Sequence, residues 1–565
     1  MRILLALLIL LMPLQAEAAQ RDMSDFRQIP VLNEGRVKPL ESFARSYLVV
    51  MSGKTKAGDL DAAAWLAEAL FDQESAYTRP VFLIADPRLR DALELPEAKG
   101  NRYSFAVLSA SLAAHEKTIR AAVETPEEKL SDQQRALVNL YYKTLAYAEI
   151  SHSLTLVLPA GAEGKTYLDT GKSSGDMEAH KSTRILRVIP PLWDADGELW
   201  FSPWQVLVEG RSSPAGTQLL REWQNLATAY HSGDATAWQQ QAAKVKALTY
   251  DIAGNHADKN IKALEVLYHD LNLLKVALVI YIGCFIMLLI SFFRGKTNCR
   301  KVVFGLMSGA AIMQAVAIIM RMIIMARPPV ATLYETTIFV SLIAVILCLI
   351  FEARRKDGMA LLTASIIGSV LLFISTRYAA DGDTLQMLVA VLDTNFWLAT
   401  HVVTITMGYG ATLSAGCLAH LYLIRAAAGR EGNTGLLKTV MATGLVAMFF
   451  SILGTILGGI WADQSWGRFW GWDPKENGAM LICLWLLFCF HGRLTGQLSP
   501  LWFAALMALG NIIVALAWFG VNLLSVGLHS YGFTQQGIAL ALGMFCAVEL
   551  ILVGGLVLLA KRKGA

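Results

Sequence analysis

Apolar and polar positions divide the chain into two parts that meet near residue 270. Beyond that point, apolar residues gather into nine runs, most of them near the ~20 residues that cross ~30 Å of hydrocarbon as a helix. The expected spans are 271–293, 301–325, 333–351, 358–376, 396–424, 437–460, 478–492, 500–520 and 536–560. The pattern predicts a mainly α-helical protein whose polytopic membrane domain of about nine spans occupies residues 271–565.

Residues 19–270 are predicted to form an extracytoplasmic soluble domain that is mainly helical. Helix-period apolar positions run through Ala62–Phe71, Asp132–Ile150 and Gln218–Tyr230. The stretch Ile261–Ile290 changes from polar to apolar, which indicates one helix that enters the membrane without a break.

Residues 1–18 have the pattern of a secretory signal peptide. Arg2 precedes an apolar run, Ile3–Leu14, and Ala16-Glu17-Ala18 is a small-x-small cleavage site. Retention as an uncleaved anchor is the alternative. Either outcome places the domain that follows outside the cytoplasmic membrane.

Positive charge alternates between the loops of the membrane domain. By the positive-inside rule, the basic loops and the C-terminus are expected in the cytoplasm. The first span then runs from outside to inside, which agrees with an exported front domain on the periplasmic side of the inner membrane. The basic segments are Arg294–Lys301, Arg354–Lys356, Arg425–Lys438, Arg493 and Lys561–Lys563.

Composition excludes several classes of protein. With 55% apolar and 17% charged residues and a mean hydropathy of +0.45, the chain is neither disordered nor a purely soluble enzyme. The net charge of +4 comes without a basic stripe, so no nucleic-acid partner is expected. No Cys-x-x-Cys-His occurs, and therefore the chain is not itself a c-type cytochrome.

The segment Trp461–Glu476 is unusually rich in tryptophan. Aromatic residues at a membrane boundary are commonly anchors, but indole faces interleaved with glycines also suit a large flat apolar ligand. Asp473-Pro474-Lys475-Glu476 predicts a capping box in which Asp473 caps a helix rather than donating a proton. The residues singled out as ligand-binding are Trp466, Gly467, Trp470, Gly471, Trp472 and Asp473.

Four histidines lie in or beside the predicted spans. His401 and His529 share the membrane face of the tryptophan-rich segment, and two imidazoles facing a flat platform are what six-coordinate haem iron needs. His420 and His491 lie near the inner ends of their spans, where they serve either a functional site or a bond to a neighbouring helix. Glu549, in the middle of the last span, needs a partner or a proton.

Two arginines lie at the outer end of the second span. Arg321 can extend outward to the membrane surface, and Arg327 is expected in the outer loop. Either arginine is alternatively a candidate contact for a haem propionate.

The segment Trp-Gly-x-x-Trp-Gly-Trp-Asp-Pro-Lys-Glu at 466–476 closely resembles the tryptophan-rich motif of the haem-handling proteins of cytochrome c maturation. Within that superfamily, residues 320–560 resemble the CcsA (ResC) type of the system II cytochrome c synthase. The supporting stretches are Pro329–Thr336, Phe396–His401, Phe490–Arg493, Val521–Leu523 and Leu528–Gly532.

The resemblance implies that haem b is exported, presented at the outer face and joined through two thioether bonds to an apocytochrome c. It implies that His401 and His529 bind the outer haem iron and that His491 belongs to an intramembrane haem site. Whether the chain is itself the haem lyase or a haem exporter and chaperone stays open. A membrane receptor leaves these histidines without a role, and an ion transporter disagrees with the few charges in the spans.

The resemblance also implies a membrane partner of the CcsB (ResB) type, which residues 19–270 do not resemble. The second ligand of the intramembrane haem is therefore either supplied by that partner or is His420. The front domain, which opens with the distinct stretch Ile29–Leu40, is interpreted either as a docking platform for the apocytochrome or partner, or as a structural extension.

Overall fold

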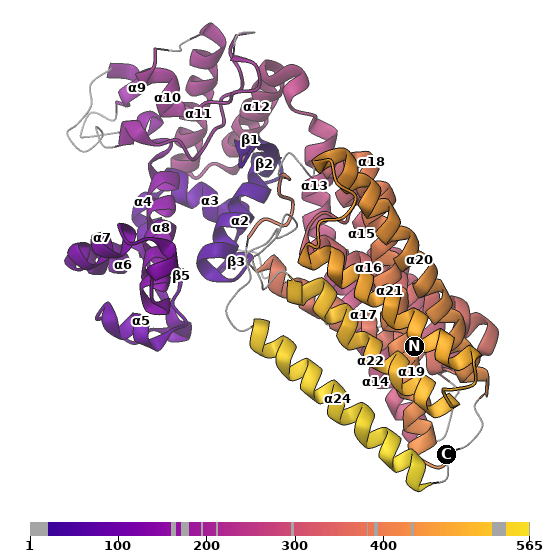
Figure 1. The fold of residues 1–565 in the computed structure, drawn as a ribbon. Coiled ribbons are helices and arrows are strands. Elements are labelled where there is room, and N and C mark those ends of the chain that lie inside the picture. The colour runs from indigo at the N-terminus through magenta and orange to yellow at the C-terminus, as the bar shows by residue number, and fades with distance from the viewer. Residues whose placement is uncertain are drawn as a thin grey trace. The chain divides into compact units, whose positions relative to one another are not determined.

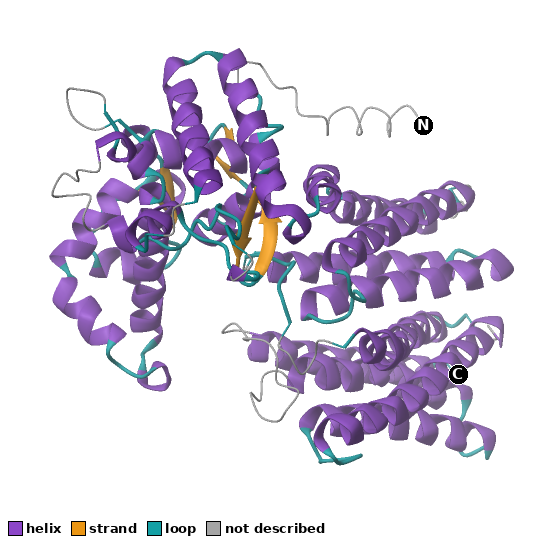
Figure 2. Cartoon of the chain, turned by 90° about the horizontal axis from the view of Figure 1, so that it is seen from above, coloured by secondary structure: helices purple, strands orange, loops and turns teal. Residues whose placement is uncertain are grey.

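The computed structural model describes residues 21–159, 165–170, 180–193, 196–210, 213–294, 299–380, 382–388, 394–430, 434–521 and 538–563. The predicted signal peptide and His529 lie outside these residues. The chain divides into two compact units, Met1–Val266 and Leu267–Ala565 (Figure 1). Within the described residues, the strands belong to the front unit and the membrane unit is helical (Figure 2).

The front unit is mainly helical, as predicted. Its helices are α2 (Leu40–Ser52), α3 (Ala62–Phe71), α4 (Gln73–Thr78), α5 (Pro87–Ala92), α6 (Phe105–Ala114), α7 (Glu116–Val123), α8 (Asp132–His152), α9 (Tyr167–Thr170), α10 (Pro203–Val208), α11 (Pro214–Ser232), α12 (Ala235–Ala253) and α13 (Lys259–Leu271), the last of which extends past its boundary. Four tryptophans are buried in its core, where they supply large apolar areas. They are Trp65, Trp204, Trp223 and Trp238.

The strands of the front unit form three antiparallel pairs. They are β1 (Pro30–Asn33) with β2 (Arg36–Pro39), β3 (Lys56–Ala57) with β4 (Leu60–Asp61), and β5 (Pro80–Leu83) with β6 (Arg102–Ser104). The distinct stretch that opens the domain is thus a hairpin. Its two-residue turn, Glu34-Gly35, has positive φ at both positions, as a type I′ turn requires.

The helix that leads into the membrane unit is broken, so the prediction of an unbroken run is wrong. α13 ends at Leu271, and α14 (Leu273–Phe293) begins two residues later. Between them, Asn272 has a φ of 44°, in the left-handed region. Asparagine tolerates this conformation better than most residues, and a hydropathy pattern carries no signal of it.

The membrane unit confirms the predicted polytopic helical architecture. Nine helices of the described residues are long and apolar enough to cross a bilayer. After α14 come α15 (Arg300–Met325), α16 (Leu333–Arg355), α17 (Met359–Ala379), α19 (Val403–Ala427), α20 (Thr434–Trp466), α21 (Pro474–Leu494), α22 (Pro500–Ala515) and α24 (Ile538–Arg562).

Two of these helices contain a π-helical turn. α18 (Asn395–Trp397) and the π-helical turn η9 (Leu398–Val402) precede α19, and η10 (Leu516–Gly520) continues α22. The sixth span also differs from its predicted end at residue 460, because α20 continues through Trp466. The first part of the tryptophan-rich segment is therefore helical.

Close approach between helices positions the functional side chains. A Cβ added at Gly454 of α20 would lie 2.8 Å from the Ile405 Cα of α19. Gly416 of α19 leaves room for Asn511 of α22 in the same way, since its added Cβ would lie 2.1 Å from the Asn511 Oδ1. Glycine thus brings α20 and α22 against α19 at distances that larger residues would prevent.

Candidate functional site

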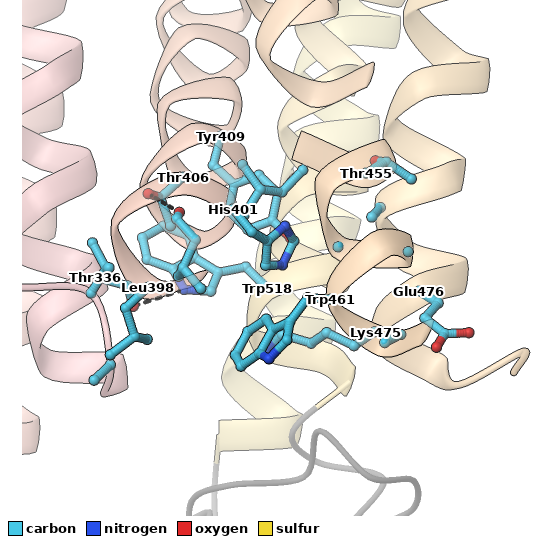
Figure 3. A pocket seen from close by; sticks show the side chains of 18 of the residues that line it. Thr336, Leu398, His401, Thr406, Tyr409, Thr455, Trp461, Lys475, Glu476 and Trp518 are labelled. Carbon is cyan, nitrogen blue, oxygen red and sulfur yellow. Dashed lines mark hydrogen bonds between the residues drawn. The ribbon is translucent and has the colours of Figure 1, made fainter. Parts of the chain in front are cut away.

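A cavity opens among the helices that carry the tryptophan-rich segment and His401. Its volume is about 180 Å³. The walls come from the start of α16 and from η9, α19, α20, α21 and η10, and most of the lining is apolar. Residues that line it include Thr332, His401, Tyr409, Trp461, Trp466, Phe469, Trp470, Lys475, Glu476 and Trp518 (Figure 3).

His401 lies in the π-helical turn η9 and borders this cavity. Its Nδ1 is 2.8 Å from the carbonyl oxygen of Gly454. A carbonyl can only accept, so Nδ1 carries the proton and Nε2 is the unprotonated nitrogen of the neutral imidazole. This is the arrangement in which a histidine ligates a metal through one nitrogen while the other fixes the ring.

Glycine on α20 makes room for the His401 ring. A Cβ at Gly458 would lie 2.6 Å from His401 Cε1 and 3.0 Å from its Nδ1. The next residue, Gly459, is equally constrained, because its Cβ would lie 2.4 Å from the Phe469 ring. Both contacts are shorter than van der Waals contact, so a side chain at either position would displace a ring from the cavity wall.

The three tryptophans that were predicted to bind a ligand differ in their exposure to the cavity. Trp466 and Trp470 line the cavity, whereas the side chain of Trp472 is 70% exposed and its ring stands nearly perpendicular to that of Trp470. The two glycines of this segment, Gly467 and Gly471, differ in their surroundings. Gly467 has a φ of 68° and follows the end of α20, and the Arg468 guanidinium lies where a side chain of Gly471 would be.

The capping box at the start of α21 is confirmed. Asp473 Oδ1 accepts from Lys475 N at 2.8 Å, and Glu476 Oε2 accepts from Asp473 N at 3.2 Å. Glu476 Oε2 also accepts from Gly471 N at 2.7 Å. The two carboxylates therefore fasten the tryptophan-rich segment to the helix end.

The two outer arginines do not line the cavity. Arg321 and Arg327 are buried, and each places Nη2 near the same carboxylate oxygen of Glu335, at 3.1 and 3.2 Å. The other Glu335 oxygen accepts from the backbone N–H of Ala331 at 3.0 Å. Because Ala331 lines the cavity, the ion cluster is connected to the cavity wall through this backbone hydrogen bond.

The inner histidines have different surroundings. His420 places Nδ1 2.8 Å from the Gly416 carbonyl and Nε2 3.3 Å from Glu549. Asn511 donates to the same Glu549 oxygen at 3.1 Å, so the carboxylate of the last span has partners on α19 and α22. His491 is exposed on α21, and among the described residues it makes no hydrogen bond or ring contact with His420.

Sequence reasoning missed several residues of the cavity. Lys475 lies inside the motif but was assigned no role beyond its place in the cap, and Tyr409 and Trp518 lie outside every candidate stretch. Their positions depend on how α19 and η10 pack together, and nothing in the local sequence signals this.

Comparisons with known proteins cover the part of the chain that contains the cavity. The family model "Cytochrome C assembly protein" matches residues 330–529. The cytochrome c biogenesis protein CcsA of Guillardia theta is 30% identical over 239 residues, which are 36% of this chain and 76% of that protein. CcsA of Chlorella vulgaris is 30% identical over 247 residues, 36% of this chain and 78% of that protein.

A longer relative matches over a similar part of this chain but over a smaller share of its own length. Protein NrfI of Wolinella succinogenes is 28% identical over 232 residues, which are 39% of this chain and 25% of that protein. On the CcsA matches, which span most of those relatives, the chain belongs to the CcsA family of cytochrome c biogenesis proteins.

Proposed function

We propose that the chain presents haem b at the extracytoplasmic face of the inner membrane and supports its covalent attachment to an apocytochrome c. The observation that carries this proposal is His401, whose Nδ1 is held by the Gly454 carbonyl beside a cavity walled by indole rings. A neutral imidazole held in this way can bind iron through Nε2.

In this proposal His401 and His529 would bind the iron of the outer haem. Trp466 and Trp470 offer flat apolar faces to the porphyrin, and the open mouth of the cavity admits a planar ligand. The residues of this chain hold and orient the haem, while the vinyl groups and the cytochrome thiols perform the addition.

The proposed topology follows from the charged loops. Basic residues at the ends of α16 and α24, such as Arg355 and Lys561, support a cytoplasmic position for those ends, and the cavity would then open on the opposite side. A signal peptide at residues 1–18 exports the front unit to the extracytoplasmic side of the membrane. The front unit serves either as a docking platform for the apocytochrome or partner, or as a structural extension.

A second, intramembrane haem site is proposed at His491. Because His491 is exposed on α21, a partner of the CcsB type can supply the opposite ligand at that surface. Binding by His420 would instead require it to exchange its contact with Glu549 for iron.

The alternative function is a haem exporter or chaperone that leaves ligation to its partner. Both functions use the same haem residues, and they differ in product, which is either a covalent cytochrome or a transferred haem. Co-expression with an apocytochrome, with and without the CcsB-type partner, separates them through haem-stained gels.

The absorption spectrum of the detergent-purified protein tests the haem site itself. Sharp reduced α and β bands are expected in the wild type, and they should weaken or shift in the double variant His401→Ala/His529→Ala. His256→Ala, at an exposed histidine of the front unit, is the matched control. Wild-type protein that contains no haem, even when made with the partner in haem-replete cells, would refute the proposal.

A further inference from the structure

Lys475 brings a positive charge to the aromatic cavity. Among the described residues that line the cavity, it is the one with an ammonium group. The side chain is half-buried on the first turn of α21. Figure 3 shows Lys475 among the residues that border the cavity.

The two carboxylates nearest to Lys475 in sequence accept hydrogen bonds from backbone N–H groups, although Glu476 also lines the cavity and the charge of Asp473 acts on Lys475. Asp473 caps the helix through backbone N–H groups, and Glu476 accepts from the backbone of Gly471 and Asp473. Figure 3 shows the Glu476 carboxylate turned away from His401. No described residue accepts a hydrogen bond from Lys475 Nζ or forms an ion pair with it.

The other cations of this region have different positions. Arg321 and Arg327 are buried against Glu335 and lie outside the cavity lining. Arg468 lies over Gly471 and is not part of the lining either. A partly buried ammonium among apolar and aromatic side chains is costly without a counter-ion. The cavity therefore favours a flat apolar ligand with an anionic edge.

We propose that Lys475 binds a propionate carboxylate of the haem and thereby sets the rotation of the porphyrin within its own plane. This inference rests on the proposed haem site. Histidine ligands would hold the iron but would not by themselves determine how the porphyrin is rotated within its own plane. The propionates occupy one edge of haem b and the vinyl groups lie on other edges. A carboxylate held at Lys475 therefore determines which edge faces the incoming thiols.

The test measures binding of two haems to the full chain, purified without haem and reconstituted in nanodiscs. One ligand is protohaem and the other is its dimethyl ester, which keeps the ring, iron and vinyl groups but lacks the propionate charge. The variants are Lys475→Met and Lys475→Gln, with Arg468→Gln as a matched loss of charge outside the cavity and His401→Ala as the iron-ligand control.

The wild type should bind protohaem about tenfold or more tightly than the ester, as expected for a charge-assisted hydrogen bond. Both Lys475 variants should weaken protohaem binding by a similar factor, leave ester binding within about twofold and so abolish the preference. Arg468→Gln should retain the preference for protohaem, and His401→Ala should weaken the binding of both haems.

Each contrary result has a separate meaning. If the Lys475 variants bind both haems more weakly by the same factor, Lys475 has a structural role and the inference is overturned. Loss of the preference in Arg468→Gln, with retention in the Lys475 variants, would move the carboxylate contact to Arg468. Equal binding of the two haems by the wild type also overturns the inference, without any variant. Failure of the wild type to bind either haem would reject the proposed function itself.

Discussion

His401 is fixed to Gly454 by a 2.8 Å hydrogen bond from Nδ1 to the backbone carbonyl, one turn before the glycine that makes room for its ring. The carbonyl belongs to α20, whereas the histidine belongs to the π-helical turn that precedes α19. The orientation of the proposed iron ligand is thus a property of the contact between two helices.

Gly458→Ala should reduce haem binding although it replaces none of the proposed ligand residues. The added Cβ would lie 2.6 Å from the imidazole and force the ring off the Gly454 carbonyl. Loss of such an orienting contact lowers metal affinity by about 10–100-fold. Haem content per protein, read from reduced spectra, measures the effect. Gly309→Ala, where an added Cβ meets nothing within 4 Å, is the control. Unchanged spectra for Gly458→Ala would contradict this role of the glycine.

Replacing Asp473 separates a helix cap from a charged ligand. Asp473→Ala should destabilise the start of α21 by about 1 kcal/mol, while Asp473→Asn, which can still cap, should lose much less. Thermal unfolding and haem content should therefore change together in the alanine variant and little in the asparagine variant. If asparagine is as harmful as alanine to haem content while the melting temperature is unchanged, the carboxylate charge itself acts on the ligand.

Glu335→Gln should destabilise the membrane unit strongly. The substitution leaves Arg321 and Arg327 buried without their shared counter-ion, and breaking a buried pair of this kind costs about 3–5 kcal/mol. Thermal unfolding in detergent checks this. Asp463→Asn, at an exposed acid of α20, should be close to neutral. A small effect of Glu335→Gln would show that the arginines are not held by this carboxylate.

The inner histidines should respond differently to truncation. His491→Ala is expected to change the spectrum of the complex with the partner. His420→Ala is expected to leave that spectrum unchanged and to lower stability by about 1–3 kcal/mol, because Glu549 loses a buried partner. A spectrum that changes in His420→Ala as it does in His491→Ala would instead support His420 as the second iron ligand.

The front unit should lose stability as the pH falls from about 6.5 towards 4. Burial, and to a smaller extent the charge of His180, lowers the pKa of His152 from its ordinary value of 6.5 to about 4. The His180 ring stacks on it at 3.8 Å, and the Tyr77 hydroxyl lies 2.8 Å from its Nε2. In this pH window the unfolded chain binds the proton and the folded chain does not, so acidification favours unfolding.

Hydrogen–deuterium exchange of α8 peptides in the full chain, measured between pH 7 and 4.5 and corrected for intrinsic rates, follows this effect. Protection should fall over this range in the wild type and fall less in His152→Asn. Equal pH dependence of the two proteins would show that His152 is not the group responsible.

Much of the fold could be predicted from sequence because its signals are local. Runs of apolar residues indicated the spans, and Asp473 and Glu476 indicated the start of α21, since a capping box needs only two residues three positions apart. The left-handed residue Asn272 could not be predicted, because the same apolar pattern is compatible with a continuous helix.

The partners of charged side chains could not be predicted either, because they come from different segments of the chain. The attraction of Arg321 and Arg327 to Glu335 depends on how separate segments fold back on one another, whereas the sequence pattern indicates only the approximate depth of each arginine. The expectation of a positively charged side chain near the ligand agrees with the cavity lining. The residue that carries this charge, however, is Lys475 and not an arginine.

The two π-helical turns make the cavity sensitive to chain length. Each residue advances an α-helix by about 100°, and a π-helical turn accommodates one residue more than an α-helical turn. Deleting one residue from Leu398–Val402 would rotate everything before the deletion by about that angle relative to α19, and deletion within Leu516–Gly520 would do the same to η10 relative to α22. Hydropathy would be nearly unchanged, and the helices would still span a bilayer. Alignments of relatives should therefore be anchored separately on each side of these turns, because one misplaced gap exchanges the residues that face the cavity for residues on another side of the helix.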